Sequence, residues 1–89
     1  MIIEFDKSFE KSLDKIKDKS LYPKIEKIII RLENSKSFVS ISQIRKMTGF
    51  KTYFRYRVGD YRIGFEMINE TTIRFIVIAH RKEIYKLFP

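Results

Sequence analysis

Apolar residues in the first third of the chain have the spacing of one strand followed by two helices. Residues 1–6 alternate in polarity and predict a first strand, after which Asp6 can cap a helix that runs to about Lys19. The apolar positions of this helix are separated by four and three residues, namely Phe9, Leu13 and Ile16. A second helix begins near Pro23, because a proline in the first turn loses no helical hydrogen bond. Its buried face follows the i, i+3, i+4, i+7 pattern at Ile25, Ile28, Ile29 and Leu32.

The rest of the chain has the period-two alternation of strands. Residues 43–47 fit a short strand, and turn residues stand at 59–60 and 69–71. Three antiparallel strands are predicted, over 53–58, 61–68 and 72–79. Residues 81–88 fit a short helix or an irregular arm. The predicted fold class is α+β: two N-terminal helices form a hairpin and pack on one face of a small, mainly antiparallel twisted sheet, in the order β-α-α-β-β-β-β.

A two-residue turn at Gly59-Asp60 sets the register of the sheet and sorts its side chains onto two faces. The expected core face is apolar and contains Phe54, Tyr56, Val58, Tyr61, Ile63, Phe65, Met67, Ile73, Phe75, Val77 and Ala79. The expected opposite face is largely basic and contains Tyr53, Arg55, Arg57, Arg62, Gly64, Glu66 and Arg74, with Ile76 and Ile78 beside them.

On the basic face, arginines stand next to one another without an acid in their register. Arg57 lies opposite Arg62 with Arg55 one step along, although like charges in opposed positions destabilise a sheet. Glu66 opposite Arg74 is by contrast a compensated pair. Arginine binds phosphate through its planar fork, and a glycine inside a strand, here Gly64, often marks close approach by a ligand or another backbone. The cluster therefore predicts a phosphate site; the alternative is that these arginines simply solvate an exposed face.

The composition restricts the partners and the chemistry. A chain of 89 residues predicts one domain, 1–89, and a net charge of +8 favours nucleic acid, an anionic membrane or an acidic protein segment. The chain has no cysteine, one histidine and no glycine-rich nucleotide loop, so we expect neither a metal nor another cofactor. Without a secretory signal or an apolar run of about 18 residues, a cytoplasmic location is expected.

A second group of candidate residues follows the last predicted strand. Arg81 and Lys82 can extend the phosphate site, and so can Lys46 of the short strand predicted over residues 43–47. Tyr85 can stack on a base or offer a phenol, or its ring can pack the tail onto the core. His80 is the one histidine, a residue type suited to proton transfer, and is a candidate general acid or base; the alternative is a plain polar residue at a strand end.

The two runs YFRYRVGDYRI at 53–63 and IVIAHRKEIY at 76–85 resemble the RelE/ParE toxin superfamily, and the resemblance covers nearly the whole chain. It implies a toxin of a type II toxin–antitoxin pair, with a small acidic antitoxin encoded next to it. Toxins of the RelE branch enter the ribosomal A site and cut mRNA there without a metal. The 2′-OH of the RNA attacks the phosphate, which gives a cyclic phosphate and a 5′-OH. ParE-type members instead poison DNA gyrase, and a basic RNA-binding module without catalysis is a third alternative.

The resemblance also assigns roles by position. Arg55 and Arg57 fall where RelE has basic strand residues, and Arg62 falls where it has its phosphate-stabilising arginine. Arg81 lies near the second catalytic arginine, and Tyr85 lies on the catalytic tyrosine. This chain departs from the best-known member in having arginine where that member has lysine. Because arginine does not give up its proton, the resemblance leaves proton transfer to His80, to Tyr85 or to alignment of the RNA alone.

Overall fold

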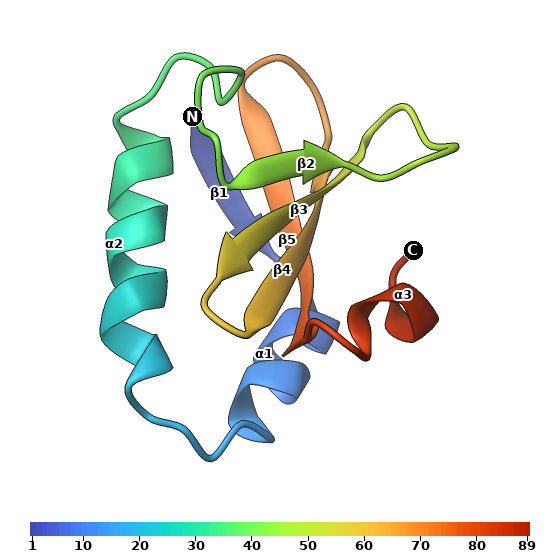
Figure 1. The fold of residues 1–89 in the computed structure, drawn as a ribbon. Coiled ribbons are helices and arrows are strands. Elements are labelled where there is room, and N and C mark those ends of the chain that lie inside the picture. The colour runs from blue at the N-terminus through green and yellow to red at the C-terminus, as the bar shows by residue number, and fades with distance from the viewer.

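The computed structural model describes residues 1–89 and confirms the predicted fold class and element order (Figure 1). The elements are β1 (Ile2–Phe5), α1 (Lys7–Asp14), α2 (Leu21–Glu33), β2 (Ile44–Lys46), β3 (Tyr53–Val58), β4 (Tyr61–Met67), β5 (Thr72–His80) and α3 (Ile84–Leu87). The last of these is the short helix foreseen within 81–88. None of the helices has the length and apolarity that crossing a membrane requires.

One five-stranded sheet in the order β1-β5-β4-β3-β2 forms the centre of the fold. β1 pairs with β5 in parallel, and the other neighbours are antiparallel. The predicted β3–β4 register is confirmed, with Arg57 opposite Arg62 and Arg55 opposite Gly64. Gly59 supplies the turn between these strands with a φ of +59°, a value that other residues rarely adopt.

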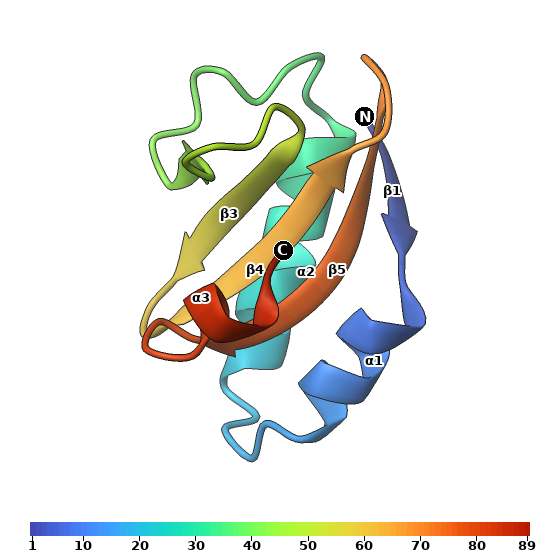
Figure 2. The ribbon, with the colours of Figure 1, turned by 90° about the vertical axis from the view of Figure 1, so that its right-hand side faces the viewer.

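The two N-terminal helices contribute to one core on the same side of the sheet. Asp6 caps α1 as predicted: it accepts hydrogen bonds from the hydroxyl and the backbone N–H of Ser8, which lower the pKa of its carboxyl. α1 ends at Asp14, earlier than the predicted Lys19, and the chain then turns at Asp18, whose carboxylate accepts the N–H and hydroxyl of Ser20. α2 crosses the core face, whereas α1 packs mainly against β5 (Figures 1 and 2).

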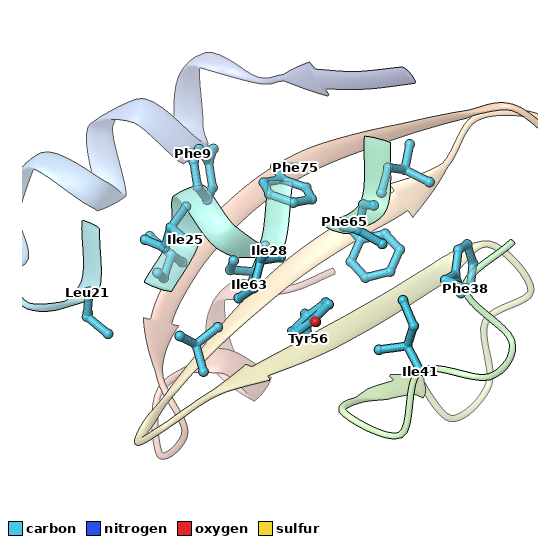
Figure 3. Close-up of a cluster of buried hydrophobic side chains, with 14 residues drawn as sticks. Phe9, Leu21, Ile25, Ile28, Phe38, Ile41, Tyr56, Ile63, Phe65 and Phe75 are labelled. Atoms are coloured by element: carbon cyan, nitrogen blue, oxygen red, sulfur yellow. The ribbon is translucent and has the colours of Figure 1, made fainter. Parts of the chain in front are cut away.

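The main core is a layer of aromatic and aliphatic side chains between α2 and the sheet (Figure 3). Its fully covered members include Phe9, Leu32, Ile63, Phe65, Ile73 and Phe75. The ring of Phe75 meets that of Phe9 edge to face at a centroid distance of 5.3 Å, which ties α1 to β5. This layer covers one side of the sheet only.

A β-bulge in β5 overturns part of the predicted face assignment. Phe65 pairs with Phe75 but Gly64 pairs with Val77, so Ile76 has no partner in β4. The extra residue inverts the alternation beyond it. Ile78 is therefore in the core, while Val77 and Ala79 are on the opposite face, the reverse of the prediction for all three. The predicted pairing of Glu66 with Arg74 in the register of β4 and β5 is confirmed, but the ion pair of Arg74 is with Glu4 of β1, at 3.0 Å.

The bulged segment is held from the side by serines of α1. β1 stops pairing at Phe75, and beyond that point the hydroxyl of Ser8 shares its one hydrogen between the carboxylate of Asp6 and the carbonyl of Ile76. Ser12 accepts the N–H of Ile78 at 3.0 Å. These hydroxyls replace the missing strand at the edge of β5, so the bulge depends on α1.

Replacing Ser12 with alanine should lower the free energy of unfolding by about 1–3 kcal/mol, because the N–H of Ile78 would lose its partner at a covered position. Urea unfolding monitored by circular dichroism measures this change. Ser40→Ala is the matched control: Ser40 is exposed and forms no hydrogen bond, so its effect should stay within about 0.5 kcal/mol. Equal unfolding free energies for the two variants would contradict the role assigned to Ser12.

Candidate phosphate-binding site

The face of the sheet opposite α2 is divided between a covered half and an open half. α3 lies over β4 and β5, and its apolar contacts reach Tyr53 at the start of β3, while the rest of β3 is left open beside it (Figure 2). Apolar residues fill the covered half, namely Met47, Val77, Ala79, Ile84 and Phe88. Arginines of β2, β3 and β4 line a hollow in the open half, together with Ser42 and Gln43; they are Arg45, Arg55, Arg57 and Arg62. We call these four residues the arginine cluster.

The strand register forces the members of the arginine cluster together. Arg45 pairs with Arg55 across β2 and β3, and Arg57 pairs with Arg62 across β3 and β4. The single ion pair of the structure joins Arg74 to Glu4, so no carboxylate neutralises the cluster. The predicted set of Arg55, Arg57 and Arg62 thus shares one side of the sheet and is not locked by the chain's own acids. Such a concentration of positive charge is suited to an anion.

Arg62 is the most constrained member. Its Nη1 donates to the carbonyls of Gly59 and Tyr61, both at 2.8 Å, which anchors the guanidinium over the β3–β4 turn. Its Nε and Nη2 donate no hydrogen bond within the protein and remain available to a ligand. Burial lowers the pKa of Arg62, and the charges of Arg57, Arg55 and Arg81 lower it further. A bound phosphate would relieve both effects, because it supplies hydrogen-bond acceptors and opposite charge.

Tyr85 reaches the arginine cluster from α3. Its hydroxyl accepts a hydrogen bond from Nη1 of Arg55, and the guanidinium carbon of Arg55 lies 5.1 Å from the centroid of its ring. The side chain is 64% exposed, so the alternative in which it packs into the core does not apply. The phenol is therefore positioned at the edge of the hollow, where a bound molecule can contact it.

Of the other predicted site residues, Arg81 lies near the arginine cluster, whereas His80 lies on the other face of the sheet. Arg81 is held near the cluster by its backbone N–H, which donates to the carbonyl of Asp60 at 2.8 Å. His80 points to the opposite face, since its neighbour Ala79 is the partner of Arg62 while His80 itself pairs with Tyr61. Its Nδ1 accepts the N–H of Lys82 at 3.2 Å, and its ring meets Tyr61 at a centroid distance of 5.7 Å. The structure thus does not bring His80 to the cluster.

Three further expectations require correction. Lys46 pairs with Phe54 and shares the core side of the sheet, so it cannot join the cluster; its neighbour Arg45, which the sequence analysis missed, does. Alternation within β2 was the available signal, but it does not reveal which face is which without the register to β3. Lys82 is exposed in the turn before α3 and does not line the hollow. Gly64 admits the ring of Phe88 and not a ligand.

Comparisons with known proteins agree on one family. A family model described as the ParE toxin of the type II toxin–antitoxin system parDE matches residues 3–85. Toxin RelE3 of Methanocaldococcus jannaschii is 40% identical over 90 residues, which cover 100% of both chains. A chain in the crystal structure of a RelB–RelE antitoxin–toxin complex from Methanococcus jannaschii superposes with a TM-score of 0.79 at 40% identity, over 97% of this chain and 99% of that one. The isolated RelE toxin of E. coli shares the fold, with a TM-score of 0.68 at 18% identity, over 97% of this chain and 92% of that one.

Inorganic phosphate should stabilise the protein through the arginine cluster. At ten times its dissociation constant, an anion that binds only the folded state adds about 1.4 kcal/mol, or roughly 6–11 °C in Tm for a domain of this size. Thermal scans with phosphate against chloride at constant ionic strength measure the shift. It should shrink markedly in Arg45→Ala and persist in Lys46→Ala, which removes the neighbouring charge from the other face. Equal shifts in both variants would show that phosphate binds elsewhere.

Proposed function

Because the chain belongs to the RelE/ParE superfamily of toxins from type II toxin–antitoxin systems, we propose that it is an endoribonuclease that cuts mRNA in the ribosomal A site. The observation that carries this proposal is the arginine cluster with the hydroxyl of Tyr85 at its edge. An RNA strand offers such a site a phosphate for the guanidiniums and a base or a 2′-OH for the tyrosine.

The cluster supplies charge stabilisation for attack by the 2′-OH of the RNA. The P–O2′ bond forms while the P–O5′ bond breaks, which leaves a cyclic phosphate and a 5′-OH. The 2′-OH loses one proton and the leaving oxygen gains one, so the step needs no co-reactant. In the phosphorane between these states the phosphoryl oxygens carry extra negative charge, and the free Nε and Nη2 of Arg62 are oriented by the turn to receive it. Arg57 and Arg45 add to the positive field around the same atoms.

Proton transfer falls to Tyr85 in this scheme. Arginines do not deprotonate, and His80 lies on the other face of the sheet. The phenol of Tyr85 is the group in contact with the cluster that can take up or release a proton. Its ring over Arg55 fixes the hydroxyl relative to the phosphate position.

A second candidate is inhibition of DNA gyrase without nuclease activity. The description of the matching family model favours it, since that model represents ParE toxins. The combination of Arg55, Arg57, Arg62, Arg81 and Tyr85 favours the nuclease, because resemblance to the RelE branch assigns those positions to RNA cleavage. The two candidates make opposite predictions for ribosomes and for gyrase.

The proposed partners follow from the same surface. A structural relative occurs in a RelB–RelE antitoxin–toxin complex, and we extend this to a cognate antitoxin for the present chain. A net charge of +8 predicts that the antitoxin contributes acidic side chains where it covers the toxin. The ribosome and mRNA are the other partners, which implies action in the cytoplasm.

Arg62→Ala should reduce A-site cleavage by roughly 100-fold or more, as loss of a transition-state donor does in other enzymes. Primer extension on mRNA from translating ribosomes treated with purified toxin measures the cut. Arg45→Ala should weaken cleavage, whereas Lys46→Ala should retain it, because these adjacent cations face opposite sides of the sheet. Supercoiling by gyrase should be unaffected by the toxin. Stalled supercoiling with intact mRNA would support the gyrase candidate and overturn the nuclease.

Tyr85→Phe should slow cleavage by about 10²–10⁴-fold, because the ring over Arg55 is kept while the proton carrier is lost. His80→Gln should cleave at the wild-type rate with an unchanged pH–rate profile, since the imidazole contacts Tyr61 on the far face. Single-turnover rates across pH measure both variants. A fast Tyr85→Phe variant beside a slow His80→Gln variant would assign the proton transfer to the histidine instead.

A further inference from the structure

The position of Tyr85 depends on a helix that is too short to be stable alone. α3 spans four residues, Ile84–Leu87, whereas isolated helices need about 12–15 residues to be even marginally stable in water. Two buried side chains flank the exposed tyrosine: Ile84 is 0% exposed and Phe88 is 2% exposed. Contacts of these two residues with the sheet therefore determine where the phenol lies.

Phe88 lies on the sheet at the one position that lacks a side chain. A Cβ added to Gly64 would lie 2.6 Å from both Cδ2 and Cγ of Phe88, closer than real Cβ contacts, so the ring rests directly on the backbone of β4. Tyr53 of β3 closes one side of this seat, with its ring edge to face at a centroid distance of 5.3 Å. The ring and the glycine form a complementary pair, which we call the Phe88–Gly64 seat.

The Phe88–Gly64 seat and the hydroxyl of Tyr85 are both held by one pair of opposed residues in the sheet. Gly64 pairs with Arg55, and Arg55 donates to the hydroxyl of Tyr85. This residue pair thus holds α3 at two points: Phe88 packs on Gly64 of β4, and Tyr85 accepts the hydrogen bond of Arg55 of β3. Because one short helix joins these two points, displacement of the ring would shift the hydroxyl of Tyr85 relative to the arginine cluster.

We propose that Phe88 is a positioning residue for Tyr85, and that Gly64 is glycine in order to admit its ring. This inference rests on the proposed nuclease function. Phe88 is not among the residues that line the hollow, so its expected effect on catalysis is through the placement of α3.

Phe88→Ala should reduce the single-turnover cleavage rate by roughly 100-fold, the loss that a misplacement of about 1 Å can cause. The affinity for ribosomes and mRNA should change little, because the arginine cluster belongs to the sheet and not to α3. Phe88→Leu, which keeps an apolar side chain in the seat, should recover part of the rate. Leu87→Ala is the matched control, since Leu87 lies on the same helix but is 59% exposed. A Phe88→Ala variant that cleaves at the wild-type rate would overturn the proposal.

Gly64→Ala provides the reciprocal test. In the presence of Phe88 the new methyl group should push the ring out of the seat and slow cleavage as Phe88→Ala does. In the Phe88→Ala background it should have no further effect, because the atoms it would strike are gone. If the losses of cleavage rate in Gly64→Ala and Phe88→Ala were additive in the double variant, the two residues would act independently, and the proposed pairing of Gly64 with Phe88 would be wrong.

The free toxin gives a readout that does not depend on activity. Nuclear Overhauser effects between the ring of Tyr85 and the side chain of Arg55 should be present in the wild type and in Leu87→Ala. They should be lost in Phe88→Ala and in Gly64→Ala, with the remaining spectrum preserved. If the wild type shows these contacts but does not cut mRNA, the proposed function fails while the positioning of Tyr85 stands. If both variants retain the contacts, the positioning role fails whatever the activity.

Discussion

Repulsion among guanidinium groups on the uncovered side of a sheet is the constraint around which this small fold is arranged. Arg57 opposite Arg62 and Arg45 opposite Arg55 are pairings that a sheet avoids unless something else fixes its register. The fixed register comes from the other face, where Tyr56, Ile63 and Phe65 are buried beneath α2. A slip of one residue would expose these apolar groups, and this loss exceeds the repulsion between the partly exposed arginines.

α3 packs on the same side of the sheet as the arginine cluster. α3 lies over β4 and β5, and its apolar contacts extend to Tyr53 and Met47, so an apolar half and a basic half of this face meet at Gly64 and Arg55. Tyr85 is placed on this boundary, between a buried anchor and an open hollow. A phenol at such a boundary keeps contact with solvent and ligand while its backbone is held by packing.

Sequence patterns predict those parts of this structure that local geometry decides. The β3–β4 hairpin follows from a two-residue turn and from period-two alternation, so the opposed arginines could be foreseen. The β-bulge at Ile76 could not, because its stability comes from hydroxyl groups of α1, remote in sequence. It reversed the faces of Val77, Ile78 and Ala79. For Arg45 and Lys46, three residues of edge strand contain too little pattern to define a face.

Gly64 shows a further limit of sequence reasoning, since a glycine indicates close approach but not what approaches. The occupant is the chain's own Phe88. A ligand can instead bind the arginine cluster beside Gly64. Relief of the repulsion among these arginines depends on the negative charge of the ligand and not on its identity. Any polyanion that enters the hollow relieves the repulsion, whether its charges are RNA phosphates or the carboxylates of an antitoxin. An antitoxin segment that entered the hollow would compete with RNA for the same arginines. Inhibition by an antitoxin bound there would then require no change in the shape of the toxin.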